Sequence, residues 1–233
     1  MNWIRKIFEL VRTGKTSDSD TVHGRVIYLL ILVALLHFIY PITISGATFN
    51  LIVYQLLYAG MFIAGILVAS DSRPHLLAAL STALIWLVCS VVYALDSTDR
   101  LKTLATYLAL LPFQATIVYL LLRYIFRKRA VNRDVLLAAI TVFILLGALF
   151  VPIYGTLELL QPGSFADNAR MGQPVFWQQF IYFSLVTLTT TGYGDILPVS
   201  PWARAVANVE MVIGVLYIAI LMARLVGLYS QET

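Results

Sequence analysis

Long apolar runs separated by short polar turns make up most of the chain from residue 26 onward. Each run has about 20 residues, the length that a helix needs to cross the hydrocarbon core of a bilayer. The polar segments 71–74 and 96–100 and the basic segment 123–134 mark turns between runs. The pattern predicts an all-α membrane protein with six membrane-spanning helices, at 26–45, 50–70, 75–95, 103–123, 134–156 and 203–225.

The pattern changes between the fifth and sixth predicted helices. Residues 157–173 are polar and contain Gly and Pro, which is typical of a loop outside the bilayer. Residues 174–188 are apolar and start with a proline, which suits a first helical turn, but as a helix they would extend only about 22 Å. The irregular stretch "TTTGYGD" follows at 189–195. A half-length helix followed by non-helical backbone predicts a re-entrant loop, which must line a water-filled path or be buried in protein.

The composition agrees with a membrane protein, because 60% of the residues are hydrophobic and 12% are charged, against about 25% charged in an average soluble domain. Of the 16 lysines and arginines, 12 fall in segments on the same side as the N-terminus. The other four are Arg100, Lys102, Arg170 and Arg204. The positive-inside rule therefore predicts that both termini are cytoplasmic in a multi-pass protein of the cell membrane. This distribution explains the net charge of +4 without a nucleic-acid partner.

The first 25 residues are predicted to be a cytoplasmic segment outside the spans. In "MNWIRKIFELVR", residues 1–12, apolar and basic positions fall on opposite faces of a helix. Such a helix suits the anionic inner leaflet, and the alternative is a short helix that packs on the protein itself. A polar connector follows it.

The stretch Thr190-Thr191-Gly192-Tyr193-Gly194-Asp195 resembles the signature sequence of potassium channels, T-V-G-Y-G-D. Its surroundings resemble the family's pore as well: an outer helix, a loop, a short aromatic-rich pore helix, a proline and an inner helix, together covering about 134–229. The resemblance is to prokaryotic six-helix members with a single pore domain. It implies a homotetramer in which 130–233 is the pore domain and 26–129 forms four peripheral helices.

The chemistry of the stretch suits a selectivity filter. A K⁺ ion gives up its water only where oxygens replace the hydration shell, and consecutive backbone carbonyls can do this when all point inward. Glycines permit the unusual dihedral angles that this demands. By resemblance, the K⁺ ligands are the carbonyls of Thr190, Thr191, Gly192 and Tyr193 and the hydroxyl of Thr190, with Gly194 closing the outer end and Asp195 at the outer mouth. No cofactor is expected beyond the permeant K⁺.

Further residues are expected to support the filter or the gate. Tyr182, Phe183 and Thr187 on the short helix are predicted to support the filter. Glu210 is an acidic residue deep in an apolar run, which makes it a functional hypothesis. It either braces the filter by accepting hydrogen bonds from the pore loop or lines the cavity and attracts ions. Gly214 stands where the family has its inner-helix hinge, and the alternative is a packing glycine.

The fourth predicted helix has no Lys or Arg between Lys102 and Arg123. A voltage sensor needs several charges inside the membrane field. The sequence therefore predicts a channel that is not gated by a charged fourth helix. Arg224, near the inner end of the sixth helix, is expected to extend toward lipid headgroups.

Two alternatives to a potassium-selective channel were considered. One is a weakly selective cation channel, since small filter changes alter discrimination. The other is an intramembrane aspartyl protease, because "GYGD" at 192–195 also fits a G-x-G-D pattern. That chemistry requires a second carboxylate, and the remaining Asp residues near the spans lie in turns or at span ends: Asp71, Asp96, Asp99 and Asp134. The chain is therefore not expected to be an enzyme.

Overall fold

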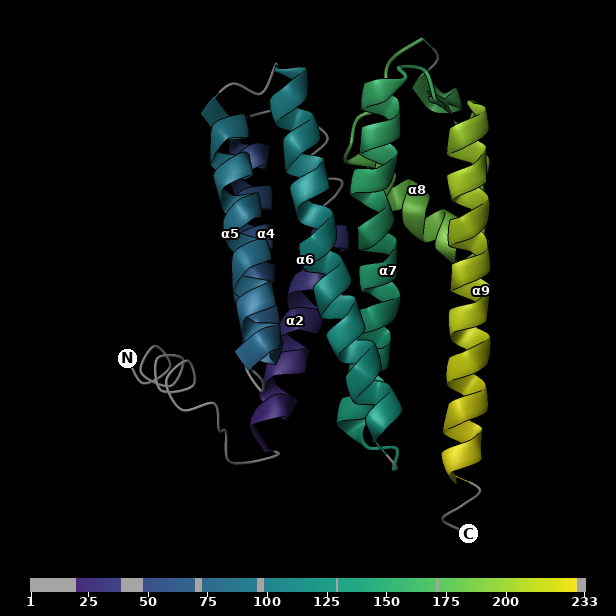
Figure 1. Ribbon diagram of the computed structural model, residues 1–233. Helices are drawn as coiled ribbons and strands as arrows, with labels where there is room; N and C mark the ends of the chain where they lie inside the picture. Colours follow the sequence, from purple (N-terminus) through teal and green to yellow (C-terminus); the bar gives the residue numbers. More distant parts are fainter. Residues whose placement is uncertain are drawn as a thin grey trace.

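A computed structural model describes residues 20–38, 48–69, 73–95, 99–128, 130–170 and 172–229. The predicted amphipathic segment at 1–12 lies outside these residues. The described chain is a bundle of long helices with one short helix and one pair of strands (Figure 1). In chain order the elements are α2 (Asp20–Phe38), α4 (Thr48–Ala69), α5 (Arg73–Leu95), α6 (Arg100–Arg127), α7 (Arg133–Leu160), β1 (Phe165–Asp167), a 3-10 turn (Asn168–Arg170), α8 (Gln179–Leu188), β2 (Ile196–Pro198) and α9 (Pro201–Tyr229).

Four helices are long and apolar enough to cross a membrane within the described residues: Arg73–Ala94, Arg100–Arg127, Arg133–Leu160 and Pro201–Gly227. They agree with four of the six predicted spans. The other two predictions, 26–45 and 50–70, coincide with α2 and α4, whose described apolar parts are the shorter Val26–Phe38 and Gln55–Ala69. Residues 39–45 of the first prediction lie outside the described part of the chain.

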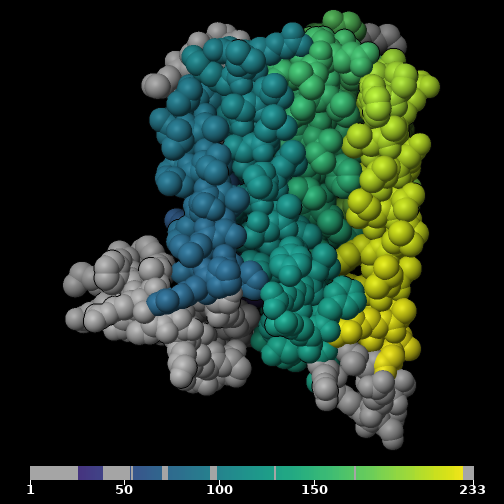
Figure 2. Space-filling view, in the orientation of Figure 1, coloured from purple at the N-terminus to yellow at the C-terminus, as the bar shows by residue number. Residues whose placement is uncertain are grey.

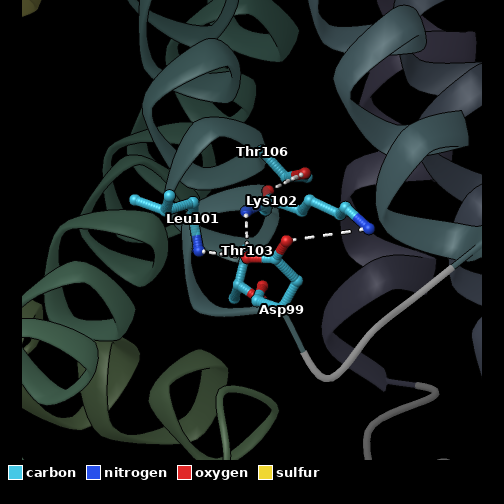
Figure 3. A network of polar contacts seen from close by, with 5 residues as sticks. All are labelled: Asp99, Leu101, Lys102, Thr103 and Thr106. Carbon is cyan, nitrogen blue, oxygen red and sulfur yellow. Dashed lines mark hydrogen bonds and ion pairs between the residues drawn. The ribbon is translucent and has the colours of Figure 1, made fainter.

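The start of α6 shows how a polar turn sets a helix boundary (Figure 3). The Asp99 carboxylate accepts hydrogen bonds from the N–H groups of Leu101, at 2.8 Å, and Lys102, and it also pairs with the Lys102 ammonium at 3.7 Å. Such a cap satisfies N–H groups that have no partner within the helix. The helix therefore begins at Arg100, three residues before the predicted start.

Helix α7 is the centre of the bundle and packs against α2, α6, α8 and α9. Of its most apolar window, 61% is buried, whereas only 11% of the corresponding window of α9 is buried. In Figure 2, α9 runs along one edge of the molecule. One long face of α9 is therefore uncovered in the single chain.

Two predicted boundaries in the interrupted region are wrong. Residues 157–160, which were predicted to belong to a loop, continue α7, and the loop after it is held by Glu158, whose carboxylate accepts from the N–H groups of Gly163 and Phe165 at 2.8 and 3.1 Å. The short helix begins at Gln179 and not at Pro174. The Gln179 side chain accepts from the Phe176 N–H at 2.8 Å, and this fixes residues 174–178 as a turn before the helix.

The strands β1 and β2 were not predicted. They pair antiparallel with Phe165 opposite Pro198 and Asp167 opposite Ile196. The pair lies beyond the end of α7 and beside the start of α9, at the upper end of Figure 1. There Ser200 accepts from the Ala203 N–H with its hydroxyl, at 3.2 Å, so that α9 starts at Pro201.

Candidate functional site

Helix α8 lies obliquely between α7 and α9 (Figure 1). Four aromatic side chains from three elements hold it there: Tyr154, Phe165, Phe180 and Phe183. The ring centroid of Tyr154 is 5.0 Å from that of Phe183 and 5.3 Å from that of Phe165, in both cases edge to face. All four are buried. The position of α8 is therefore set by a packed aromatic cluster, and Phe183 belongs to this cluster.

In the backbone after α8, residues with positive and negative φ angles alternate from Thr190 to Gly194. The φ angle is positive at Thr190 (56°), Gly192 (59°) and Gly194 (77°) but not at Thr191 or Tyr193. Alternation of this kind turns successive peptide groups toward the same side. The glycines were expected to take up such angles, whereas a positive φ at threonine was not expected, since a β-branched residue rarely adopts it.

The N–H groups at the start of this segment donate to carbonyls at the end of α8. The Thr190 N–H donates to the Thr187 carbonyl at 3.0 Å, and the Thr191 N–H donates to the Val186 carbonyl at 2.9 Å. The Gly192 N–H shares the Val186 carbonyl at 3.4 Å. The start of the segment is thus held by hydrogen bonds to the last turn of α8, which includes the predicted support residue Thr187.

The carbonyls of the segment divide into two groups. The Gly194 carbonyl accepts from the Asn168 side-chain amide at 3.0 Å, and the Asp195 carbonyl accepts from the Asn168 N–H at 2.8 Å. Within the described chain, no donor reaches the carbonyls of the preceding four residues, Thr190, Thr191, Gly192 and Tyr193. Four consecutive exposed oxygens therefore remain without a partner in one chain, and they are the four carbonyls that the resemblance assigned to K⁺.

The outer end of the segment brings three predicted site residues together. The Tyr182 hydroxyl donates to the Asp195 carboxylate at 2.6 Å. The rings of Tyr182 and Tyr193 lie parallel, with an interplanar angle of 2° and centroids 6.4 Å apart. Tyr193 nevertheless remains 71% exposed. The second oxygen of Asp195 accepts from the Ile196 N–H at 2.9 Å, so the carboxylate is partly enclosed at the mouth.

The threonine hydroxyls lie differently from one another. The Thr189 hydroxyl donates to the Leu185 carbonyl at 2.7 Å and lies 2.8 Å from the Thr191 hydroxyl. The Thr191 hydroxyl therefore has a local partner. The potassium-channel signature has an apolar residue at this position.

Glu210 and Gly214 both lie where α9 contacts α8. Glu210 is fully buried, and its two carboxyl oxygens lie within hydrogen-bond distance of the hydroxyls of Tyr154 on α7 and Ser184 on α8. A Cβ on Gly214 would lie 2.0 Å from the Leu188 carbonyl oxygen. The structure thus brings Glu210 against the short helix, and it packs Gly214 against the last residue of that helix.

Sequence reasoning missed several residues that hold the site, namely Tyr154, Asn168, Asp167, Gln179 and Ser184. Asp167 is buried and accepts from the Gln179 amide at 2.5 Å, which ties the loop to the start of α8. The sequence contained a signal for Ser184. It is a hydroxyl within a short apolar helix, and the carboxyl group of Glu210 in the next helix needs hydrogen-bond partners when it is buried. No signal existed for Asn168, because its partners lie 26 or more residues away.

Known proteins were compared with the chain in the region that contains this site. Residues 135–231 match a protein-family model described as "Ion channel". The chain is 44% identical over 55 residues to a potassium voltage-gated channel protein, shk-1, of Caenorhabditis elegans, covering 22% of this chain and 10% of that protein. It is 38% identical over 66 residues to two pore potassium channel c of Oryza sativa subsp. japonica, covering 28% of this chain and 14% of that protein. No solved structure matches.

Proposed function

From the match of residues 135–231 to the ion-channel family model, we propose that the chain is a subunit of a potassium-selective channel. Four copies surround one pore and conduct K⁺ passively across the cell membrane. The matches to potassium channels span only about a quarter of this chain, so the selectivity and the assembly are proposals.

The observation that carries the proposal is the set of four consecutive carbonyls without a partner. In a single chain, these oxygens have no donor among the described residues, although the N–H groups of Thr190, Thr191 and Gly192 and the next two carbonyls are bonded. Such a row of oxygens suits the replacement of a K⁺ hydration shell. The positive φ angles at Thr190, Gly192 and Gly194 support this reading, because they turn the row toward one side.

The number of filter segments supports a homotetramer. One chain has one such segment, and a ring of carbonyls around an ion needs several. The uncovered face of α9 and the exposed ring of Tyr193 are surfaces that neighbouring subunits would cover. Residues 130–233 then form the pore domain, 26–129 form four peripheral helices, and both termini are cytoplasmic.

The peripheral helices are not expected to act as a charged voltage sensor. Helix α6 has no Lys or Arg between Lys102 and Arg123. Voltage dependence of gating should therefore be weak.

A liposome flux experiment tests the proposed function. Purified protein in vesicles should support K⁺ flux that greatly exceeds Na⁺ flux and is blocked by Ba²⁺. Equal K⁺ and Na⁺ flux would favour the weakly selective cation channel instead, and tetramers without flux would refute a channel. Asp195→Asn distinguishes the protease alternative, since it should spare K⁺ passage and would remove any peptidase activity.

A further inference from the structure

Glu210 lies where α7, α9 and the proposed pore helix, α8, meet. It has no exposed surface. Of the elements packed against α9, α7 presents the Tyr154 hydroxyl and α8 presents the Ser184 hydroxyl. In the part of the chain that the structure describes, no Lys, Arg, His or second carboxylate contacts Glu210. A carboxylate in such a place has no opposite charge to compensate it.

The hydrogen atoms at this site can be counted. The Ser184 hydroxyl contacts two oxygens, one from Glu210 and the other the Gly147 carbonyl at 2.7 Å. A hydroxyl has a single hydrogen to donate, and a backbone carbonyl can only accept. If Glu210 were ionised, one of these two contacts would bring two oxygen lone pairs together without a hydrogen between them, at a residue with no exposed surface.

A proton on Glu210 supplies the missing hydrogen, so that each of the three contacts contains one. The protonated oxygen donates to the Ser184 hydroxyl, and Ser184 then donates to the Gly147 carbonyl. The Tyr154 hydroxyl donates to the other oxygen of Glu210. Every contact then contains one hydrogen, and every donor in the chain of bonds has one acceptor.

We infer that Glu210 is a positioning residue that acts as the neutral acid, in a directed chain of hydrogen bonds from Tyr154 through Glu210 and Ser184 to Gly147. This inference rests on the proposed function, since it assigns α8 the role of pore helix. The chain of bonds ties α8 to both α7 and α9. Ser184 lies two residues before Val186, whose carbonyl holds the N–H groups of Thr191 and Gly192. Displacement of Ser184 is therefore transmitted to the filter.

The test uses two substitutions of Glu210 in the full chain. Glu210→Gln keeps the hydrogen pattern of the neutral acid, because its amide donates to Ser184 and its carbonyl accepts from Tyr154. It should retain K⁺ flux within about twofold of wild type, with the same ratio of K⁺ to Na⁺ flux at pH 6 and pH 8. Glu210→Ala should lower K⁺ flux by about tenfold or more, since it leaves the buried Tyr154 hydroxyl without an acceptor and removes the bond that ties Ser184 to α9. Equal loss in both variants, with wild type conducting selectively, would overturn the inference and leave the proposed function standing.

Infrared spectroscopy of the membrane-embedded protein measures the proton without reference to conduction. The difference spectrum between wild type and Glu210→Gln should contain the carbonyl stretch of a protonated carboxylic acid at neutral pH. In Ser184→Ala this band should persist but move to the position of a more weakly hydrogen-bonded acid. A difference spectrum with carboxylate bands only would overturn the inference, even if Glu210→Ala fails to assemble. Should wild type lack selective flux, the proposed function fails and the band still decides the state of Glu210.

Discussion

Gly214 is the residue at which α9 comes closest to α8. A Cβ there would lie 2.0 Å from the oxygen and 3.0 Å from the carbon of the Leu188 carbonyl. These are backbone atoms at the end of α8, so they cannot rotate away as a side chain can. The helix is continuous from Pro201 to Tyr229 through this glycine. Of the two roles considered for Gly214, packing is therefore the one with a visible contact.

Gly214→Ala should destabilise the assembled protein and reduce K⁺ flux, because the added methyl displaces the residue directly before the filter segment. Overpacking of this kind costs about 1–3 kcal/mol. Thermal unfolding in detergent measures the loss. The matched control is Gly227→Ala on the same helix, where a Cβ would meet nothing within 4 Å. Equal stability of the two variants would show that the contact with Leu188 does not matter.

Gly192 differs from Gly214, because its requirement is conformational. Its φ is +59°, and a Cβ there would meet no atom within 4 Å in the single chain. An L-residue in this conformation costs about 1–2 kcal/mol, so Gly192→Ala should turn the local peptide and abolish K⁺ conduction. Gly163→Ala is the control, since Gly163 has a φ of +84° in the loop after α7. It carries similar strain and should leave flux through reconstituted tetramers unchanged; K⁺ flux persisting in Gly192→Ala would contradict the assignment.

At the scale of elements, a hydrogen bond links α6 to α7 one turn before Pro152. Pro152 lies within α7 and has no N–H, so it leaves the carbonyl of Ala148, four residues earlier, without its helical partner. The buried Gln114 of α6 donates its side-chain amide to that carbonyl at 3.2 Å. The neighbouring Gly147 carbonyl accepts from Ser184 of α8. The part of α7 before Pro152 therefore contacts α6 through the Ala148 carbonyl and α8 through the Gly147 carbonyl.

A double-mutant cycle tests this junction. Gln114→Ala should lower the free energy of unfolding by about 1 kcal/mol, because it removes a hydrogen bond to a buried carbonyl. In a Pro152→Ala background the same change should cost less, since the Ala148 carbonyl can then accept from the helix. Additive effects of the two changes would contradict this coupling. Thr116→Ala is a control on α6, because its hydroxyl donates only to the Pro112 carbonyl of its own helix.

The long elements were predictable because their signal is local. Apolar runs of span length and the absence of charge within them identify a helix without any knowledge of its partners, and α5, α6, α7 and α9 follow such runs. Gly192 and Gly194 were predictable in the same way, since only glycine takes their φ angles without cost. The strands β1 and β2 are three residues each, and each needs a partner about 30 residues away, so no local pattern specifies them. The start of α8 was missed because the Gln179 side chain, and not Pro174, organises the preceding turn.

At the scale of the whole molecule, two arginines link the ends of α6 to other helices. Arg224 of α9 donates to the carbonyls of Ile125 and Lys128, at 2.9 and 2.7 Å, at the C-terminal end of α6. Its guanidinium also lies over the Phe126 ring at 5.0 Å. At the other end of α6, Arg100 donates to the carbonyls of Leu159 and Leu160 at the end of α7. Arg224 was expected to extend toward lipid headgroups, and the structure instead has it on the protein, because a helix C-terminus attracts a cation.

Arg224→Gln should lower thermal stability in detergent, since it removes charge-assisted hydrogen bonds worth about 1.5–3 kcal/mol each in favourable cases. Unitary K⁺ conductance should stay unchanged, because Arg224 is ten residues beyond Gly214, where α9 contacts the last residue of α8 before the filter segment. Open probability should change. Single-channel recording separates the two quantities. Arg127→Gln, an exposed position at the same end of α6, is the control. Equal effects of both changes would attribute the result to surface charge alone.

The pairing of β1 with β2 also has a consequence for biosynthesis. Residues 165–167 are translated before α8 and the filter segment, but their partners at 196–198 are translated after them. Helix α8 therefore leaves the ribosome before β1 can pair with β2. The strand pair forms only after residues 196–198, which precede α9, have been translated. A chain stalled before residue 196 would expose a half-length helix and leave residues 165–167 without a strand partner.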